Sequence, residues 1–448
     1  MREVILQEVL DAREQRALAQ RELLARHGKP VLSYTMNIPG PIKDSPLIRR
    51  GFEEGLRLLG ASGIVCLDRR VIHEVTGSEL LCAVDDDAET LKALCRTIED
   101  THPTGRLFDM DVIDTDGHKL ARAEERRCIV CGAVGRGCAS RRLHSLDELT
   151  AAVNKLLRGG LLEADAARIG ALATKALLDE VDTTPKPGLV DRNNNGAHRD
   201  MTPETFRASA EALRGFWPAC FHMGVETAGK APEFAFAKLR ALGVEAEATM
   251  LAATGGVNTH KGAIFTLGTV CGAIGRLWQP EAPCCEPAEI AKGAAALCAS
   301  AVEADFAAVE QSGLARSAGE RLFLQYGLRG IRGEVAAGLP AVLETGLPTL
   351  EGCLRKGLSR NDAGVYALLA LIARGGDTNL IKRGGRELAE AMSSLIRTKL
   401  SNKLLPTMDR VRQLDGLFIR SNLSPGGCAD LLAVSYFLHD WKQQFQTE

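Results

Sequence analysis

The repeat of apolar side chains changes near residue 160, and this change constrains the fold more than any other feature of the chain. Before it, short apolar runs with a period of two alternate with helical stretches. After it, almost no such run occurs, and long Ala-, Leu- and Glu-rich stretches are punctuated by Gly, Pro and Asn. A chain of 448 residues can bury more than one core. We therefore predict an α+β domain over residues 1–158 and an all-α domain over residues 161–448, separated at Gly159–Gly160.

The expected elements follow from these periods. Asp114–Gly117 is predicted to form a hairpin turn, because Asp and Gly tolerate positive φ. The first domain is predicted to contain helices over residues 3–26 and 88–100, and strands over 31–36, 63–75, 79–84 and 107–113. The second domain is predicted to contain helices over residues 163–181, 205–228, 286–312, 363–372 and 429–445.

Composition excludes several classes of protein. Lys and Arg total 55 against 57 Asp and Glu, a net charge of -2 without the basic excess typical of nucleic-acid binding. The acidic N-terminus does not resemble a signal peptide, and no apolar run reaches the ~18 residues of a membrane span. Thirteen cysteines, an odd number without an export signal, predict reduced thiols in a cytoplasmic protein.

Asp109 and Asp111 lie two positions apart on the strand predicted over residues 107–113. Alternate residues of a strand share a face, which puts their Cβ atoms about 7 Å apart. Such a pair can hold Mg²⁺ against nucleotide phosphates, although a solvated strand face is the commoner explanation. The rigid Gly/Pro turn before Lys43 supplies a cation for phosphate. The pattern favours nucleotidyl transfer on a nucleotidyltransferase-like mixed sheet with helices, although the Gly-Ser opening usual in that fold is absent.

Four soft metal ligands follow in a compact run, Cys128, Cys131, Cys138 and His144. Reduced thiolates and an imidazole at this spacing suit a structural Zn²⁺, and the alternative is a set of buried reduced thiols. Arginines interleaved with them could face phosphates or an acidic carrier protein, or could form a solvated charge run.

Three segments in this half, Tyr34–Lys43, Ile98–Val112 and Arg127–His144, resemble the apo-citrate lyase phosphoribosyl-dephospho-CoA transferase family. The resemblance covers about residues 1–155. It implies an enzyme that moves phosphoribosyl-dephospho-CoA onto a serine of the citrate lyase acyl carrier protein, the γ subunit, and releases pyrophosphate. It also implies that Asp109 and Asp111 hold magnesium while Lys43 and Arg106 offset phosphate charge.

A polar loop over residues 184–201 interrupts the helical half, because two prolines and two glycines cannot continue a helix. Lys186, Asp191, His198 and Asp200 give this loop cation, acid and base, and a loop of this kind is more often a site than a spacer. Further polar clusters stand at the starts of helices, where free amides receive phosphate oxygens. Each alone could be a helix cap, but together they indicate loops that converge on a polyphosphate and its metal. Their candidate residues are Asn258, His260, Lys261, Glu334, Asp377, Asn379, Arg383 and Asp430, with Ser424 expected as an N-cap and Pro425 as the first residue of the last helix.

These clusters resemble the triphosphoribosyl-dephospho-CoA synthase family from about residue 165 to the C-terminus. The implied reaction joins ATP and dephospho-CoA to give triphosphoribosyl-dephospho-CoA and adenine, through a transition state with oxocarbenium character. The matching segments are Pro185–Asn193, Gly256–Gly262, Arg332–Glu334, Gly376–Asn379 and Asn422–Asp430. For this reaction we expect Asp191, Asp377 and Asp430 to serve as magnesium ligands or base, Lys186, Lys261, Arg383, Asn258 and Asn379 to bind phosphate, and Glu334 or His260 to transfer a proton to adenine.

The two resemblances together predict a bifunctional cytoplasmic transferase, part nucleotidyltransferase and part pentosyltransferase, that makes the citrate lyase prosthetic group and attaches it. Its expected partners are ATP, dephospho-CoA and the acyl carrier protein, with no nucleic acid and no membrane. Three alternatives remain at this stage. The helical half could be a magnesium-dependent glycohydrolase of nucleotide or ADP-ribosyl bonds, the first half could be a zinc-stabilised docking module, or the chain could serve the equivalent malonate decarboxylase pathway.

Overall fold

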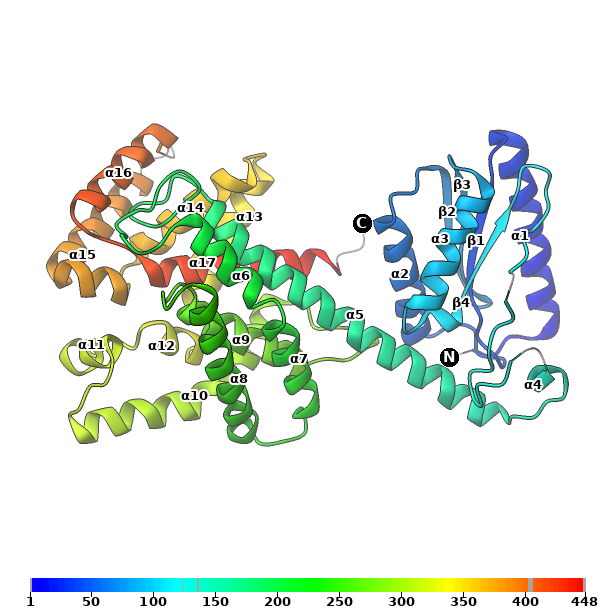
Figure 1. The fold of residues 1–448 in the computed structure, drawn as a ribbon, viewed down its shortest axis with the longest axis horizontal. Coiled ribbons are helices and arrows are strands. Elements are labelled where there is room, and N and C mark those ends of the chain that lie inside the picture. The colour runs from blue at the N-terminus through cyan, green and yellow to red at the C-terminus, as the bar shows by residue number, and fades with distance from the viewer. Residues whose placement is uncertain (1, 123, 135–136, 402–405, 446–448) are drawn as a thin grey trace. The chain divides into compact units, whose positions relative to one another are not determined.

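The computed structural model describes residues 2–122, 124–134, 137–401 and 406–445 (Figure 1). The chain divides into two compact units. The first unit comprises Met1–Asp165 and Pro280–Ala282, and the second comprises Ala166–Gln279 and Pro283–Glu448.

The first unit contains one four-stranded sheet in the order β2-β3-β1-β4. Every neighbouring pair of strands is antiparallel, so the prediction of a mixed sheet was wrong. The sequence shows where strands occur but not their direction, which the connections between them decide. The strands are β1 (Val31–Met36), β2 (Cys66–Glu74), β3 (Gly77–Val84) and β4 (Phe108–Ile113).

Helices cover both faces of this sheet (Figure 1). On one face, α2 (Pro46–Ala61) and α3 (Ala88–Thr101) pack on a core that includes Phe108, Met110 and Val112 of β4. On the other face, α1 (Leu6–His27) packs through Leu23 on a smaller core with Val31, Leu81 and Ile113. Because side chains alternate along β4, Asp109 and Asp111 lie on the face that α1 covers.

Helix α2 was not predicted from the sequence, whereas α1 and α3 were. Helix α2 begins after Ser45, whose Oγ accepts a hydrogen bond from Ile48 N at 3.2 Å. Its three glycines, at 51, 55 and 60, lower its intrinsic helix propensity. The Asp114–Gly117 turn is confirmed, with Asp114 N donating to His118 O at 2.9 Å and Gly117 N donating to Asp114 O at 3.0 Å.

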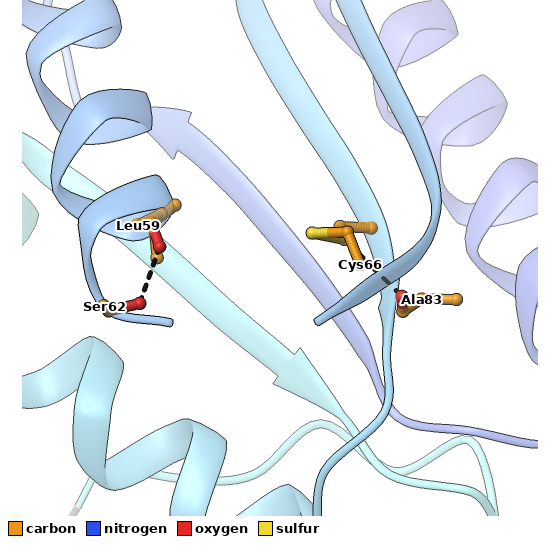
Figure 2. The surroundings of a disulfide bond; sticks show 5 residues. Leu59, Ser62, Cys66 and Ala83 are labelled. Atoms are coloured by element: carbon orange, nitrogen blue, oxygen red, sulfur yellow. Dashed lines mark hydrogen bonds between the residues drawn. A yellow bond between two sulfur atoms is a disulfide. The ribbon is translucent and has the colours of Figure 1, made fainter. Parts of the chain in front are cut away.

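Cys66 and Cys82 form a disulfide, which the prediction of reduced thiols did not include. Their Cα atoms lie 6.0 Å apart, since Cys66 opens β2 and Cys82 lies in the adjacent strand β3. Figure 2 shows Cys66 beside Ala83, with Leu59 and Ser62 at the nearby end of α2. The other eleven cysteines are free. The disulfide therefore ties the edge strand of the sheet to its neighbour.

Helix α5 runs without a break from Leu146 to Asp182, so the two glycines at which the sequence separates the predicted domains, Gly159 and Gly160, do not end a helix. A Cβ atom at Gly159 would meet nothing within 4 Å, whereas one at Gly160 would overlap the buried side chain of Thr104. Gly160 therefore permits a close contact within the first unit and does not end the helix.

The second unit is mostly helical, as predicted, and its most buried helix is α9 (Lys261–Arg276). The backbones of α9 and α7 approach closely, since a Cβ at Gly224 or Gly275 would overlap a carbonyl oxygen of the facing helix. No described helix is long and apolar enough to cross a membrane. The remaining described helices are α4 (Gly137–Ser140) in the first unit and α6 (Pro203–Ala212), α7 (Phe216–Glu226), α8 (Pro232–Ala253), α10 (Pro287–Ser312), α11 (Ala318–Tyr326), α12 (Gly330–Ala336), α13 (Leu347–Arg355), α14 (Arg360–Arg374), α15 (Thr378–Ser401), α16 (Met408–Arg420) and α17 (Gly426–Gln443) in the second.

Candidate active sites

Asp191 organises the polar loop of the second unit. Its fully buried carboxylate accepts hydrogen bonds at Oδ2 from Thr184 Oγ1 (2.7 Å) and Lys186 N (3.1 Å). Oδ1 accepts hydrogen bonds from the backbone N–H groups of Asn193 (2.8 Å) and Asn194 (3.0 Å). Both oxygens thus hold the loop in one conformation, a role that the expected metal or base function did not include.

Two residues that the sequence analysis missed fasten this loop to distant helices. Asp415 of α16 accepts hydrogen bonds from Gly188 N (2.9 Å) and Asn194 Nδ2 (3.0 Å), and burial raises the pKa of its carboxyl. The Asn361 side chain in α14 pairs with both backbone groups of Thr184, at 2.9 and 2.8 Å. Neither position carries a local signal, because each contact joins segments more than 170 residues apart.

His198 connects the loop to the segment before α17. Arg383 Nη2 donates to His198 Nδ1 at 3.1 Å, so Nε2 carries the proton and donates to Ser424 Oγ at 2.9 Å. Burial and the nearby Arg383 lower the pKa of this imidazole. Arg383 also donates to Ala197 O at 2.8 Å. The N-cap role predicted for Ser424 was wrong, because α17 begins at Gly426 with Pro425 as its N-cap.

Lys186 is almost fully buried, with 1% of its surface exposed. Its Nζ donates to the Glu180 carbonyl oxygen at 2.7 Å and forms an ion pair with Glu180 Oε1 at 2.5 Å. Glu180 lies near the end of α5 and was missed, since an acidic residue in an amphipathic helix usually faces solvent.

Asp377 connects the starts of two helices. Its Oδ1 accepts a hydrogen bond from Leu380 N of α15 at 2.9 Å, and its Oδ2 accepts one from Cys428 N of α17 at 2.8 Å. Burial nevertheless raises the pKa of the carboxyl. The Asn379 side chain lies next to Gly426, where a Cβ would come 2.8 Å from Nδ2. The predicted segments Gly376–Asn379 and Asn422–Asp430 therefore meet, as expected for loops that converge.

Asp430, on the second turn of α17, completes this group. Burial, together with the negative charges of Glu180 and Asp377, raises the pKa of its carboxyl well above the ordinary value. It accepts a hydrogen bond from the backbone of Ala263 at the start of α9, and a Cβ at Gly262 would overlap Asp430 Oδ2. Glu180, Asp377 and Asp430 are hereafter the carboxylate cluster. It meets the positive ends of α9, α15 and α17, which stabilise negative charge.

His260 lies at the N-cap of α9 and is 3% exposed. Thr259 Oγ1 donates to Ser209 Oγ at 2.8 Å, and Ser209 Oγ shares a hydrogen bond of 2.7 Å with His260 Nδ1. Its Nε2 atom is buried without a hydrogen-bond partner among the described residues. Burial and the charge of Lys186 lower the pKa of His260 to about 3. The ring is therefore neutral, and its Nε2 atom is available to a ligand.

Other predicted residues lie outside this group or serve locally. Lys261 Nζ pairs with Glu247 at 2.7 Å and is largely exposed. Asn258 Oδ1 accepts a hydrogen bond from Lys261 N at 3.3 Å in the first turn of α9. Glu334 accepts one from Ala341 N at 2.5 Å, and burial raises the pKa of its carboxyl.

In the first unit, Asp109 and Glu79 flank Thr35 in register on three neighbouring strands. The Asp109 side chain is 45% exposed and lies 3.8 Å from Arg126 Nη1. Asp111 is two residues further along the same face and pairs with Lys119. The structure thus confirms that both carboxylates share one face of β4, with Asp109 the more accessible.

The turn with Lys43 and the segment with Arg106 meet at one end of the sheet, because β1 and β4 are antiparallel and Asn37 N donates to Leu107 O at 2.7 Å. Lys43 Nζ donates to a carbonyl of its own turn, and burial lowers the pKa of the amine. Arg106 Nε donates to Arg127 O at 2.6 Å, and burial beside Arg126 lowers the pKa of its guanidinium.

Glu99 of α3 holds the arginines near β4, and it was not predicted. Its buried carboxylate accepts hydrogen bonds from Met110 N (2.8 Å) and Arg122 Nη1 (2.6 Å) and also pairs with Arg126. Glu99 therefore positions Arg126 next to Asp109.

Metal-ligand geometry differs between the candidate sites. In the described part of the chain, the group that brings three or more metal-ligating side chains within 4.8 Å of one another is Cys128, Cys131, Cys138 and His144. Mg²⁺ usually takes only one or two protein carboxylates beside phosphate oxygens and water, so it does not require such a group.

Comparison with known proteins gives a match for each unit. Residues 166–448 match the CitG family, described as ATP:dephospho-CoA triphosphoribosyl transferase. Residues 4–159 match the CitX family, described as apo-citrate lyase phosphoribosyl-dephospho-CoA transferase.

Individual relatives include two of full length. Protein CitXG of Haemophilus influenzae is 34% identical over 453 residues, which cover 97% of this chain and 96% of the relative. Protein CitXG of Leuconostoc mesenteroides is 33% identical over 457 residues, with the same coverage. A protein from Citrobacter koseri, named a probable 2-(5''-triphosphoribosyl)-3'-dephosphocoenzyme-A synthase, is 42% identical over 271 residues, 60% of this chain and 88% of the relative.

Proposed function

The chain belongs to the CitXG family, and from this premise we propose how its two units divide the chemistry. It is a bifunctional transferase of citrate lyase prosthetic-group biosynthesis. In our proposal the second unit joins ATP and dephospho-CoA into triphosphoribosyl-dephospho-CoA and releases adenine. The first unit then transfers phosphoribosyl-dephospho-CoA to a serine of the apo-citrate lyase acyl carrier protein and releases pyrophosphate.

The observation that carries the assignment of the second unit is the carboxylate cluster beside neutral His260. A ribose hydroxyl must lose a proton as it attacks the anomeric carbon of ATP, and a carboxylate with a raised pKa is a competent base. Glu180 is neutralised by Lys186, and both Asp377 oxygens accept backbone hydrogen bonds. Asp430 is therefore the proposed base, and His260 Nε2 would donate a hydrogen bond to a nitrogen of the departing adenine. The proton that the ribose hydroxyl loses to Asp430 balances the proton that adenine gains.

The triphosphate requires positive charge, which this unit offers mainly through helix N-termini. Backbone N–H groups at the starts of α9, α15 and α17 suit phosphate oxygens. Mg²⁺ would offset phosphate charge, with Asp191 and Asp377 as the proposed protein ligands. Asp191 would bind the ion in exchange for some of the four hydrogen bonds that its two oxygens accept in the loop. The side chains proposed to contact phosphate are Lys186, Lys261, Arg383, Asn258 and Asn379, with Glu334 as the alternative proton donor to adenine.

In the first unit, a carrier serine oxygen would attack the α-phosphorus, form a phosphodiester and expel pyrophosphate. Asp109 and Asp111 would hold Mg²⁺ on the triphosphate, because they share one accessible face of β4. Lys43, Arg106 and Arg126 lie at or near the same end of the sheet and would offset phosphate charge. This arrangement supports a nucleotidyltransferase-like mechanism for the unit.

Paired variants of the full chain test the division of chemistry. Asp430→Asn should lower adenine release from ATP and dephospho-CoA by about 100-fold or more, since it removes the base. Supplied with ready-made triphosphoribosyl-dephospho-CoA, the same variant should modify the carrier protein at the wild-type rate. Asp109→Asn should show the opposite behaviour. Adenine is measured by chromatography and the carrier protein by mass.

Exposed aspartates provide matched controls, Asp409→Asn in the second unit and Asp116→Asn in the first. Both controls should retain both activities. Adenine release that needs no dephospho-CoA would identify a glycohydrolase and contradict the synthase assignment. Carrier modification by a folded Asp109→Asn, Asp111→Asn double variant would contradict the metal-carboxylate mechanism.

A further inference from the structure

We propose that Cys128, Cys131, Cys138 and His144 bind one structural Zn²⁺ ion. Each side chain offers one ligand atom, and these four atoms lie within 4.8 Å of one another. Tetrahedral zinc with Zn–S bonds of about 2.3 Å and a Zn–N bond of about 2.0 Å places its ligand atoms about 3.5 to 3.8 Å apart. Cys131 Sγ and Cys138 Sγ are already 3.5 Å apart.

The backbone around the first two ligands is shaped for a thiolate. Gly132 N donates to Cys128 O at 3.0 Å, and Cys128 N donates to Ala133 O at 2.8 Å, which closes a tight turn. Gly132 has a φ of 72°, a conformation that favours glycine. The backbone N–H groups of Val130 and Cys131 point at the Cys128 sulfur. Such N–H donors stabilise a metal-bound thiolate and fix its orientation.

His144 supplies the second, independent observation. Its Nε2 is buried and has no hydrogen-bond partner among the described residues. A buried ring nitrogen without a partner costs free energy, and a metal bond would remove that cost. A Cys131–Cys138 disulfide would leave this nitrogen and the third thiol unexplained.

The charge around the group also favours a thiolate-rich site. Zinc with three thiolates and one neutral imidazole carries a net charge of about -1. Arg106 interacts electrostatically with Cys128, and Arg127 Nη1 donates to Gly132 O at 3.3 Å. Both arginines offset that charge, and Arg127 is one of the interleaved arginines whose role the sequence left open.

Zinc would stabilise a segment that has little other regular structure. Between the hairpin after β4 and the start of α5, the described residues form only α4 and an isolated bridge between Arg127 and Val134. Arg126, immediately before the first ligands, donates to Phe108 O at 2.7 Å and lies beside Asp109. Zinc would therefore hold this segment, and Arg126 with it, against the sheet. This metal assignment does not depend on the proposed function.

The test is the zinc content of the full chain purified in reductant without chelator, measured by mass spectrometry of the metal. We expect about one zinc ion per chain, because four ligands complete a tetrahedral site. Cys131→Ser and His144→Ala should each lower zinc content at least several-fold. Cys285→Ser, a partly buried free thiol in the second unit, and His118→Ala should leave it unchanged. Cobalt substitution should give the visible absorption of a tetrahedral thiolate complex.

Wild-type measurements remain informative if a ligand variant does not fold. Stepwise reaction of the wild-type thiols with an organomercurial should release zinc together with the modification of three thiols. Wild-type protein with less than about a tenth of a zinc ion per chain would overturn the proposal. A folded Cys131→Ser variant with wild-type zinc content and an unchanged cobalt spectrum would also overturn it.

Discussion

His260 combines a buried ring with a cationic neighbour, Lys186, and together they lower its pKa to about 3. The imidazole should therefore stay neutral in the folded chain from pH 8 to about pH 4, while in the unfolded chain it gains a proton below about 6.5. Below pH 6.5 the unfolded chain binds a proton at this residue that the folded chain does not bind. The contribution of neutral His260 to the free energy of unfolding is therefore complete above pH 6.5 and is lost as the pH falls toward 3.

Nuclear magnetic resonance of the ring protons checks this prediction directly. We expect no titration of the His260 signals between pH 5 and 8, and His260→Gln should show a weaker loss of stability on acidification than the wild type. A signal that titrates near pH 6.5 in the folded protein would contradict the neutral-donor role.

The pKa of Asp430 shifts in the opposite direction from that of His260, because burial and neighbouring carboxylates raise the pKa of its carboxyl. Its negative charge is then costlier in the folded chain than in the unfolded one, so stability falls as the pH rises above about 3.9. Asp430→Asn should accordingly raise the free energy of unfolding at pH 7 by about 1 to 3 kcal/mol while it lowers adenine release.

Urea unfolding of Asp430→Asn and wild type at several pH values measures this difference, which should shrink as the pH falls. Exposed Asp409 provides the control, and its Asn variant should leave unfolding unchanged. An Asp430→Asn variant less stable than wild type at pH 7 would show that the carboxylate stabilises the fold.

At the scale of elements, two adjacent glycines in α5 have opposite roles. Gly159→Ala places a methyl group in open space within a helix and should stabilise the first unit by about 0.5 to 1 kcal/mol. Gly160→Ala would overlap Thr104 and should destabilise it by about 1 to 3 kcal/mol. Thermal or urea unfolding of the two variants measures the contrast, and equal effects would contradict the close contact of Gly160 with Thr104.

Contacts between elements also explain the sites that the sequence analysis described incompletely. The sequence before α17 predicts the start of a helix, and Ser424 was predicted to supply the capping side chain. In the structure, Asp377 supplies the acceptor from another segment, 51 residues away. A local motif shows that a helix begins, whereas the identity of a tertiary cap depends on which segments pack together.

At the scale of the whole molecule, each unit has its own core and its own candidate site. A mixture of Asp109→Asn and Asp430→Asn chains should therefore produce modified carrier protein, because one chain retains the synthase and the other retains the transferase. The rate should rise with protein concentration, as expected for an intermediate that diffuses between chains. Carrier mass after incubation with ATP, dephospho-CoA and Mg²⁺ measures it, and no product at any concentration would indicate obligatory transfer within one chain.

The amino-acid sequence by itself determined that the first part of the chain is α+β and the second is mostly helical. It also determined most strand and helix positions, the shared face of Asp109 and Asp111, and the Cys/His motif. These features follow from periods of two or 3.6 residues and from short spacings, which are local properties. Only the tertiary structure decided the antiparallel sheet, the contact that requires Gly160, and the hydrogen bonds that commit Asp191 to its loop. It also brought together Glu180, Lys186 and Asp430, because burial and pairing depend on residues far apart in the chain, and no local pattern records them.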